Sequence, residues 1–228
     1  MNDAQGLRID RRSTSDQAAA VLRSRILRGE LRPGTPLEEV RLAGAFGISR
    51  NTMREAIRRL VYEGLVQHNL HRGAMVRSLS EEAVRDIYEA RMFLEPAAVL
   101  ASRGRRPDEF GTLARIAEEM YVASDTLDWS HIADLDMRFH SNIVAFLESR
   151  RISDFVRTLF GELRLGLVTL DQEDSEFALA QAREHRRIAD LLVEGRQEEC
   201  VDSLKSHLRD AEVRLRGVIA GNGARRFA

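Results

Sequence analysis

Apolar residues recur at helical spacing along most of the 228-residue chain, and the apolar/polar alternation typical of strands is almost absent. Only 4 Pro and 15 Gly interrupt this pattern, so long helices are expected. One early stretch differs, because residues 64–67 and 73–76 resemble two short strands around a polar turn. The pattern predicts a mainly α-helical protein with one small β-hairpin near its N-terminus.

Three helices are predicted before this hairpin. The first begins near Thr14 or Ser15, which are good N-cap residue types, and ends at Gly29. The second covers about 38–46, and the third runs from the capping Ser49 to about Glu63 and is stopped by Gly64. The first and third helices have apolar faces that should pack together, formed by Ala18, Val21, Leu22, Ile26 and Leu27 and by Met53, Ala56, Ile57, Leu60 and Val61. The order of helix, short helix, tight turn, helix and hairpin is that of a winged helix-turn-helix.

Polar side chains gather at the start of the third predicted helix and at the tip of the hairpin. In a winged helix-turn-helix, this helix start enters the major groove of DNA. Arginine can pair with guanine or bridge phosphates, while amide and hydroxyl groups suit base edges or phosphates. The candidate DNA-contacting residues are Ser49, Arg50, Asn51, Thr52 and Arg54 in the helix, and His71, Arg72 and Gly73 in the hairpin.

Residues 36–76 contain a Leu-Ala pair, a Gly-Ile-Ser-Arg turn, the run Arg-Glu-Ala-Ile-Arg-Arg-Leu, then Glu-Gly-Leu-Val and, in the hairpin, Arg-Gly. In this order the motifs resemble the signature of the GntR family of bacterial transcription regulators. The resemblance implies that operator DNA is contacted by Arg50, Thr52, Arg54, Arg72 and Gly73. Two positions depart from the family's pattern: Asn51 stands where Thr is common, and Val40 stands where one member uses an Arg on DNA.

The second half of the chain is predicted to form an all-helical bundle of about 140 residues, which is large enough to bury its own core. Its helices are expected at about 80–103, 108–124, 130–148, 152–171, 175–194 and 197–218. We therefore expect two domains: a winged helix-turn-helix in residues 1–78, and a helical bundle for effector binding and dimerisation in residues 79–228.

The net charge of −1 conceals an asymmetry between these two parts. Residues 1–78 contain 14 Arg and 8 acidic residues, a net charge of +6, whereas residues 79–228 have a net charge of −7. A basic head on an acidic body is typical of a nucleic-acid reader with a separate sensing part. No apolar run approaches the ~18 residues that span a bilayer, and the N-terminus lacks the apolar segment of a secretory signal. A cytoplasmic protein without a membrane partner is expected.

Four residues in the predicted bundle have the spacing of a shared metal site. Asp136 and His140 are four residues apart, so they share one helix face. His185 lies ten residues before Gly195 and His207 lies twelve after it, so an antiparallel helix pair brings them to about the same height. One carboxylate and three imidazoles suit Zn, Ni, Mn or Fe and leave a position open for water or a ligand. The alternative is three hydrogen-bonded core histidines and a surface aspartate.

The single cysteine, Cys200, excludes an internal disulfide framework and CxxC-type zinc sites. Four segments follow one another in the order of the FCD ligand-binding domain found in the FadR-like branch of the GntR family: Arg91-Met-Phe-Leu-Glu-Pro, Asp136-x-x-x-His140, Glu184-His185 and His207-Leu208. This resemblance implies a metal bound by Asp136, His140, His185 and His207. It also implies that Arg91 binds a ligand carboxylate beside the metal, and the alternative for Arg91 is a structural pair with Glu95.

The sequence thus predicts a homodimeric DNA-binding transcription regulator, expected to be a repressor and not an enzyme, that binds a palindromic operator in double-stranded DNA. Its body is expected to bind a divalent metal and a small organic acid that changes operator affinity. Two alternatives stay open. One is a metal-dependent hydrolase or lyase, although no separate general base with a defined spacing to the metal residues is apparent. The other is a regulator for which the metal itself is the signal.

Overall fold

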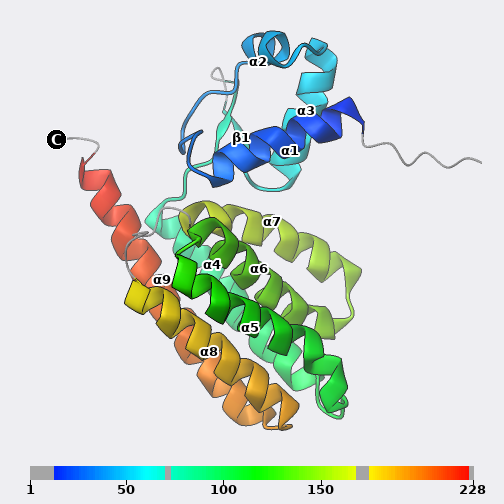
Figure 1. The fold of residues 1–228 in the computed structure, drawn as a ribbon, viewed down its shortest axis with the longest axis vertical. Coiled ribbons are helices and arrows are strands. Elements are labelled where there is room, and N and C mark those ends of the chain that lie inside the picture. The colour runs from blue at the N-terminus through cyan, green and yellow to red at the C-terminus, as the bar shows by residue number, and fades with distance from the viewer. Residues whose placement is uncertain (1–12, 70–72, 168–174, 226–228) are drawn as a thin grey trace, which may run out of the picture.

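The computed structural model describes residues 13–69, 73–167 and 175–225, which form a small head on a helical body (Figure 1). The head consists of α1 (Thr14–Leu27), α2 (Glu39–Phe46), α3 (Arg50–Tyr62), β1 (Val66–Asn69) and β2 (Gly73–Val76). The body consists of α4 (Glu81–Ala101), α5 (Gly111–Thr126), α6 (Trp129–Val144), α7 (Arg150–Leu167), α8 (Ser175–Val193) and α9 (Gln197–Arg225), with short 3-10 turns at Pro107–Phe110 and Ala145–Leu147. The predicted fold class, mainly helical with one hairpin after the first helices, is confirmed.

The helices of the head begin and end as their side chains dictate. Ser13, just before the predicted start, caps α1: its hydroxyl accepts from the Asp16 amide, and the Asp16 carboxylate accepts from the Ser13 amide. Ser49 caps α3 as predicted and accepts from the Thr52 amide. Between them, α2 ends at Gly47, whose φ of 64° lies in the left-handed region that favours glycine. These caps set the tight turn that places the start of α3 on the surface.

The apolar faces of α1 and α3 form the core of the head. Leu22, Met53 and Ile57 are fully buried there. The prediction was wrong for Val21, which is 45% exposed, while Ala19 is buried instead. The hairpin closes this core from the other side, with Val66 opposite Val76 in the register of the two strands.

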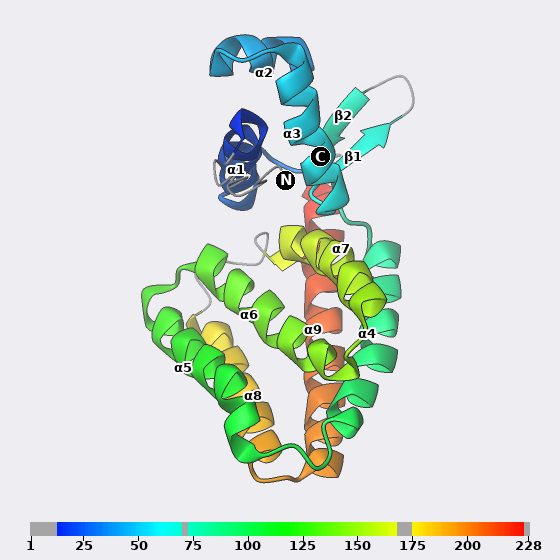
Figure 2. The ribbon, with the colours of Figure 1, turned by 90° about the vertical axis from the view of Figure 1, so that its right-hand side faces the viewer.

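The helices of the body pack as an antiparallel bundle in which α4 lies along α9 and α5 lies along α8 (Figure 2). The predicted helix over 130–148 ends earlier, at Val144, because the chain turns through a short 3-10 segment and a left-handed Glu148, whose φ is 52°. The fold at Gly195 between α8 and α9 is present as predicted. None of the described helices combines the length and the apolar character needed to cross a bilayer.

The head sits directly on α7, without a spacer. Gly161 of α7 lies against the end of α3, where an added Cβ would overlap the Glu63 carbonyl oxygen. The Thr158 hydroxyl donates a hydrogen bond to the Tyr62 carbonyl oxygen at 3.2 Å. Leu165, also on α7, is 2% exposed and belongs to the hydrophobic core of the head. The head and the body are therefore joined through α7, whose Leu165 is part of the core of the head.

Candidate metal centre and nucleic-acid interface

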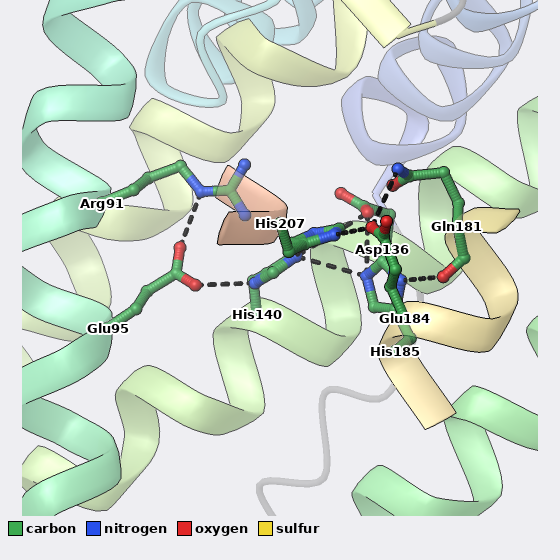
Figure 3. A network of polar contacts seen from close by, with 8 residues as sticks. All are labelled: Arg91, Glu95, Asp136, His140, Gln181, Glu184, His185 and His207. Atoms are coloured by element: carbon green, nitrogen blue, oxygen red, sulfur yellow. Dashed lines mark hydrogen bonds and ion pairs between the residues drawn. The ribbon is translucent and has the colours of Figure 1, made fainter. Parts of the chain in front are cut away.

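Helices α6, α8 and α9 bring the four predicted metal ligands together in the body (Figure 3). Asp136 and His140 come from α6, His185 from α8 and His207 from α9. One donor atom from each residue lies within 4.8 Å of the others, and all three histidines are buried. The i, i+4 spacing on α6 and the antiparallel pair α8–α9 produce this convergence.

The three imidazoles direct their Nε2 atoms at one another. The Nε2 atoms of His185 and His207 each lie 3.3 Å from Nε2 of His140. Asp136 Oδ1 lies 3.1 Å from His185 Nε2 and 3.7 Å from His140 Nε2. Two nitrogens bound tetrahedrally to one Zn²⁺ at about 2.0–2.1 Å are about 3.3 Å apart. The spacing of the donor atoms therefore fits a shared ion.

The other nitrogen of each ring faces a hydrogen-bond acceptor. The pairs are His140 Nδ1 with Glu95 Oε2, His185 Nδ1 with the Gln181 carbonyl oxygen, and His207 Nδ1 with Glu184 Oε2, each at 2.7 Å. Because a carbonyl oxygen only accepts, His185 carries its proton on Nδ1 and presents a lone pair at Nε2. The carboxylate of Glu184 imposes the same tautomer on His207. Burial raises the pKa of Glu95, but the ion pair with Arg91 favours its carboxylate form, which imposes this tautomer on His140. Such outer partners are what orient metal-binding histidines.

This tautomer places three lone pairs and a carboxylate in one small buried space. Burial lowers the pKa of His140 well below its usual value and also lowers that of His207, so both rings are neutral near pH 7. Burial opposes the ionisation of Asp136, but the positive charge of Arg91 lowers the pKa of this carboxyl group and favours its ionised form. Lone pairs at these distances repel one another unless a cation lies between them. The donor set and its protonation thus suit a divalent metal.

Arg91 of α4 lies beside this cluster. One edge of its guanidinium is hydrogen-bonded, and another of its nitrogens has no partner among the described residues. Its Nε donates to Glu95 Oε1 at 2.6 Å, and the other oxygen of Glu95 accepts from His140. The structural pair with Glu95 is therefore present. Nevertheless Nη2 of Arg91 is buried and has no hydrogen-bond partner among the described residues. The rings of Tyr88 and Phe160 flank the guanidinium, with centroids 4.9 and 5.3 Å from its central carbon.

A cavity of about 30 Å³ opens beside the cluster. Arg91, Asp136 and His207 form part of its polar wall. The apolar wall consists of Met120, Trp129, Ile132, Ala133, Leu167, Phe177 and Ala211. A buried donor without a partner costs about 1–3 kcal/mol, and more when it is charged. An anion in this cavity would remove that cost at Arg91.

The outer partners of the histidines were not predicted from the sequence. Glu95 was expected only as a possible partner of Arg91, and Glu184 and Gln181 were not expected in the site. A signal was available, because Gln181 is four residues before His185 on the same helix, so its carbonyl is the natural acceptor for that ring. The position of Glu95 between Arg91 and an imidazole from another helix depends on tertiary packing alone.

The predicted DNA-contacting residues of α3 lie at its N-terminal end. Ser49, Arg50 and Asn51 are exposed, and Thr52 is half-buried. The hydroxyls of Ser49 and Thr52 are 2.8 Å apart and hydrogen-bond each other, so both also stabilise the helix start. Arg50 and Asn51 are therefore the exposed polar side chains at the N-terminal end of α3 that have no part in this capping hydrogen bond.

Arg54, one turn further along α3, is half-buried and paired with Glu39 of α2, with Nη2 2.8 Å from Oε2. In the hairpin, Gly73 begins β2 with a φ of 71°, which a residue with a side chain rarely adopts. His71 and Arg72 lie outside the described residues.

Known proteins match both parts of the chain. The profile "Bacterial regulatory proteins, gntR family" matches residues 14–76, and the FCD domain profile matches residues 86–210. The Nta operon transcriptional regulator of Aminobacter aminovorans is 27% identical over 190 residues, which are 83% of this chain and 89% of that protein. The gluconate operon transcriptional repressor of Bacillus licheniformis is 37% identical over 139 residues, which are 60% of this chain and 56% of that protein.

A solved structure is similar over nearly the whole chain. The crystal structure of a GntR transcriptional regulator from Rhodococcus sp. RHA1 is 31% identical and has a TM-score of 0.74. The match covers 89% of this chain and 97% of that one, so it includes both head and body.

Proposed function

The chain belongs to the GntR family of bacterial transcription regulators and carries an FCD domain, and on this premise we propose that its body binds a divalent metal together with a small carboxylate that changes operator affinity. The head is a DNA-binding winged helix-turn-helix, and the protein is a transcription regulator and not an enzyme. Repressors are named among its relatives, and we propose the same direction of control here.

The proposal rests on one observation above all: three Nε2 atoms and one carboxylate oxygen lie within 4.8 Å of one another in the body. We assign Asp136, His140, His185 and His207 as the metal ligands. Zn, Ni, Mn and Fe all accept imidazole and carboxylate donors, and an ion with five or six positions keeps at least one open. When bound, the metal would attract an oxygen of the effector.

Arg91 supplies the second half of the proposed effector site. Arg91 lines the cavity, and its Nη2 is a buried cationic donor, which suits a carboxylate held between Arg91 and the metal. Glu95 holds the Nε edge of the same guanidinium and one imidazole, so it fixes the distance between the two attachment points. The small volume favours a compact acid.

For DNA, we propose contacts from Ser49, Arg50, Asn51, Thr52, Arg54, His71, Arg72 and Gly73. A homodimer would present two heads to a palindromic operator, as two-fold symmetric sites require. Phe93 of α4, which is 80% exposed, is available to such an interface in the body. We place the boundary between head and body at residues 78 and 79, directly before Ser80, which caps α4.

Thermal unfolding of the metal-stripped and metal-restored protein, with a panel of mono- and dicarboxylates, sugar acids and amino acids, tests the effector site. Native-state binding at a hundred times the dissociation constant stabilises by about 2.7 kcal/mol. One acid should raise the melting temperature of the metal-loaded protein only. If metal stabilises the protein and changes operator affinity but no acid does either, the metal itself is the signal. Absence of any metal effect would remove the proposed site.

A further inference from the structure

An ion pair in the head joins two helices beside the proposed DNA-reading surface. Glu39 is the first residue of α2, and Arg54 lies one turn into α3. Arg54 Nε lies 3.1 and 3.0 Å from the two carboxylate oxygens of Glu39, and Nη2 lies 2.8 Å from Oε2. The side chain of Glu39 is 22% exposed and that of Arg54 is 42% exposed. The carboxylate is therefore the more shielded partner, and the arginine the more accessible one.

The geometry of this pair leaves a defined part of the guanidinium free. Arginine presents five N–H donors in one plane. Glu39 occupies the edge formed by Nε and one hydrogen of Nη2, so both hydrogens of Nη1 and the second hydrogen of Nη2 remain along the outer end. Two parallel donors at that end match the O6 and N7 acceptors of guanine in the major groove. A carboxylate on one edge and a base on the other can bind the same arginine together.

We propose that Glu39 is a positioning residue for sequence recognition, which holds Arg54 by one edge so that the outer end of its guanidinium faces a base. This inference rests on the proposed insertion of the start of α3 into the major groove. A free arginine side chain loses rotamer freedom when it binds, whereas one already held by Glu39 loses less. Fixed orientation also means that the donors match one base pair better than the others, so the pair contributes to specificity.

Two other roles of the ion pair predict opposite effects. If the carboxylate is incidental, its main effect on DNA is repulsion of phosphates, and its removal strengthens binding to every sequence. If it masks Arg54, its removal strengthens binding to the operator most of all. Only a positioning role predicts weaker operator binding after a negative charge has been removed.

The chain offers a matched control in Glu38, the neighbouring acidic residue. Glu38 is exposed, and its side chain makes no capping hydrogen bond at the start of α2. Glu38→Gln and Glu39→Gln therefore remove the same charge from adjacent positions, and only the second breaks the pair. Glu39→Asp keeps the charge but shortens the side chain, so it separates charge from reach.

The experiment uses the full-length, metal-loaded protein and two DNA probes: a duplex selected from random sequence by the parent protein, and a scrambled duplex of the same composition. Glu38→Gln should tighten both complexes to a similar, small degree. Glu39→Gln should tighten the scrambled complex likewise but weaken the selected one by about tenfold, as loss of a bidentate base contact does. Glu39→Asp should weaken the selected complex alone. Glu39→Gln added to Arg54→Ala should cause no further loss.

Parallel tightening of both complexes by Glu39→Gln would overturn the positioning role, and preferential tightening of the selected complex would identify a mask instead. A parent protein that selects no sequence would overturn the insertion of α3 itself, which distinguishes that failure from failure of the Glu39 inference. Unfolding curves of each variant check that the head is intact, and Glu39→Asp keeps the test decisive if Glu39→Gln does not fold.

Discussion

In both the head and the body, a glutamate holds one edge of an arginine to which we assign a function, but the surroundings of the two pairs differ. In the head, Glu39 and Arg54 are partly exposed, so solvent can reach both side chains. In the body, Glu95 and Arg91 are at most 2% exposed, and a donor of Arg91 has no partner among the described residues. A buried polar cluster with unmatched groups is stabilised only when a ligand completes it. Ligand binding to the body should therefore change the thermal stability of the protein. Changes in the head should instead alter the affinity for DNA.

Loss of the metal should have the largest effect. His185→Ala removes the proposed ligand on α8, so the metal would no longer link α8 to α6 and α9, and metal content should fall below one ion per chain. An ion present at a thousand times its dissociation constant stabilises by about 4 kcal/mol, and at 2–4 °C per kcal/mol the melting temperature should fall by roughly 10 °C. Elemental analysis and thermal unfolding measure both quantities.

His131→Ala is the matched control for this prediction, because His131 is exposed and lies outside the cluster. It should retain the metal and the melting temperature of the parent. If His185→Ala binds metal in the same stoichiometry as the parent, His185 is not a ligand.

Arg91→Met should come next, because it leaves Glu95 buried without its cationic partner. Breaking a buried pair by removing one member costs about 3–5 kcal/mol. The response of the melting temperature to the effector acid should disappear, while the metal stays bound. If the variant is too unstable to purify, Arg91→Lys keeps a charge without the planar fork and should bind the acid more weakly. A full acid response in both variants would leave Arg91 with a structural role only.

The junction between head and body gives a smaller expected effect. In Gly161→Ala, the added methyl meets the Glu63 carbonyl oxygen, so α7 must move away from the end of α3. Overpacking of this kind costs about 1–3 kcal/mol. Gly217→Ala in α9, where nothing lies within 4 Å of an added Cβ, should instead stabilise the helix slightly. Thermal unfolding of the two variants should shift in opposite directions, and equal shifts would show that the junction is loose.

Contacts set by helix periodicity could be predicted from the sequence, whereas contacts that depend on tertiary packing could not. Helices have a fixed rise and turn, so the spacing of Asp136 and His140 and the heights of His185 and His207 about Gly195 predicted which side chains meet. The contacts of Gly161 and Leu165 with the head have no periodic signal, because they depend on how two separately patterned parts pack. The double role of Glu95 was likewise hidden, since it joins a neighbour on its own helix to a residue 45 positions away.

Of these substitutions, Arg54→Ala should change the stability of the fold least, and its main effect should be on DNA affinity. The ion pair with Glu39 is partly exposed, so its loss costs little stability, and metal content and melting temperature should stay near those of the parent. Operator affinity should fall about tenfold, and binding to scrambled DNA should fall less. The salt dependence of operator binding should change little if Arg54 contacts a base, and should lose about one counterion if it contacts a phosphate. Fluorescence anisotropy over a salt series measures both slopes. Unchanged operator affinity would show that the start of α3 does not enter the groove as proposed, and the head would then need another DNA-reading surface.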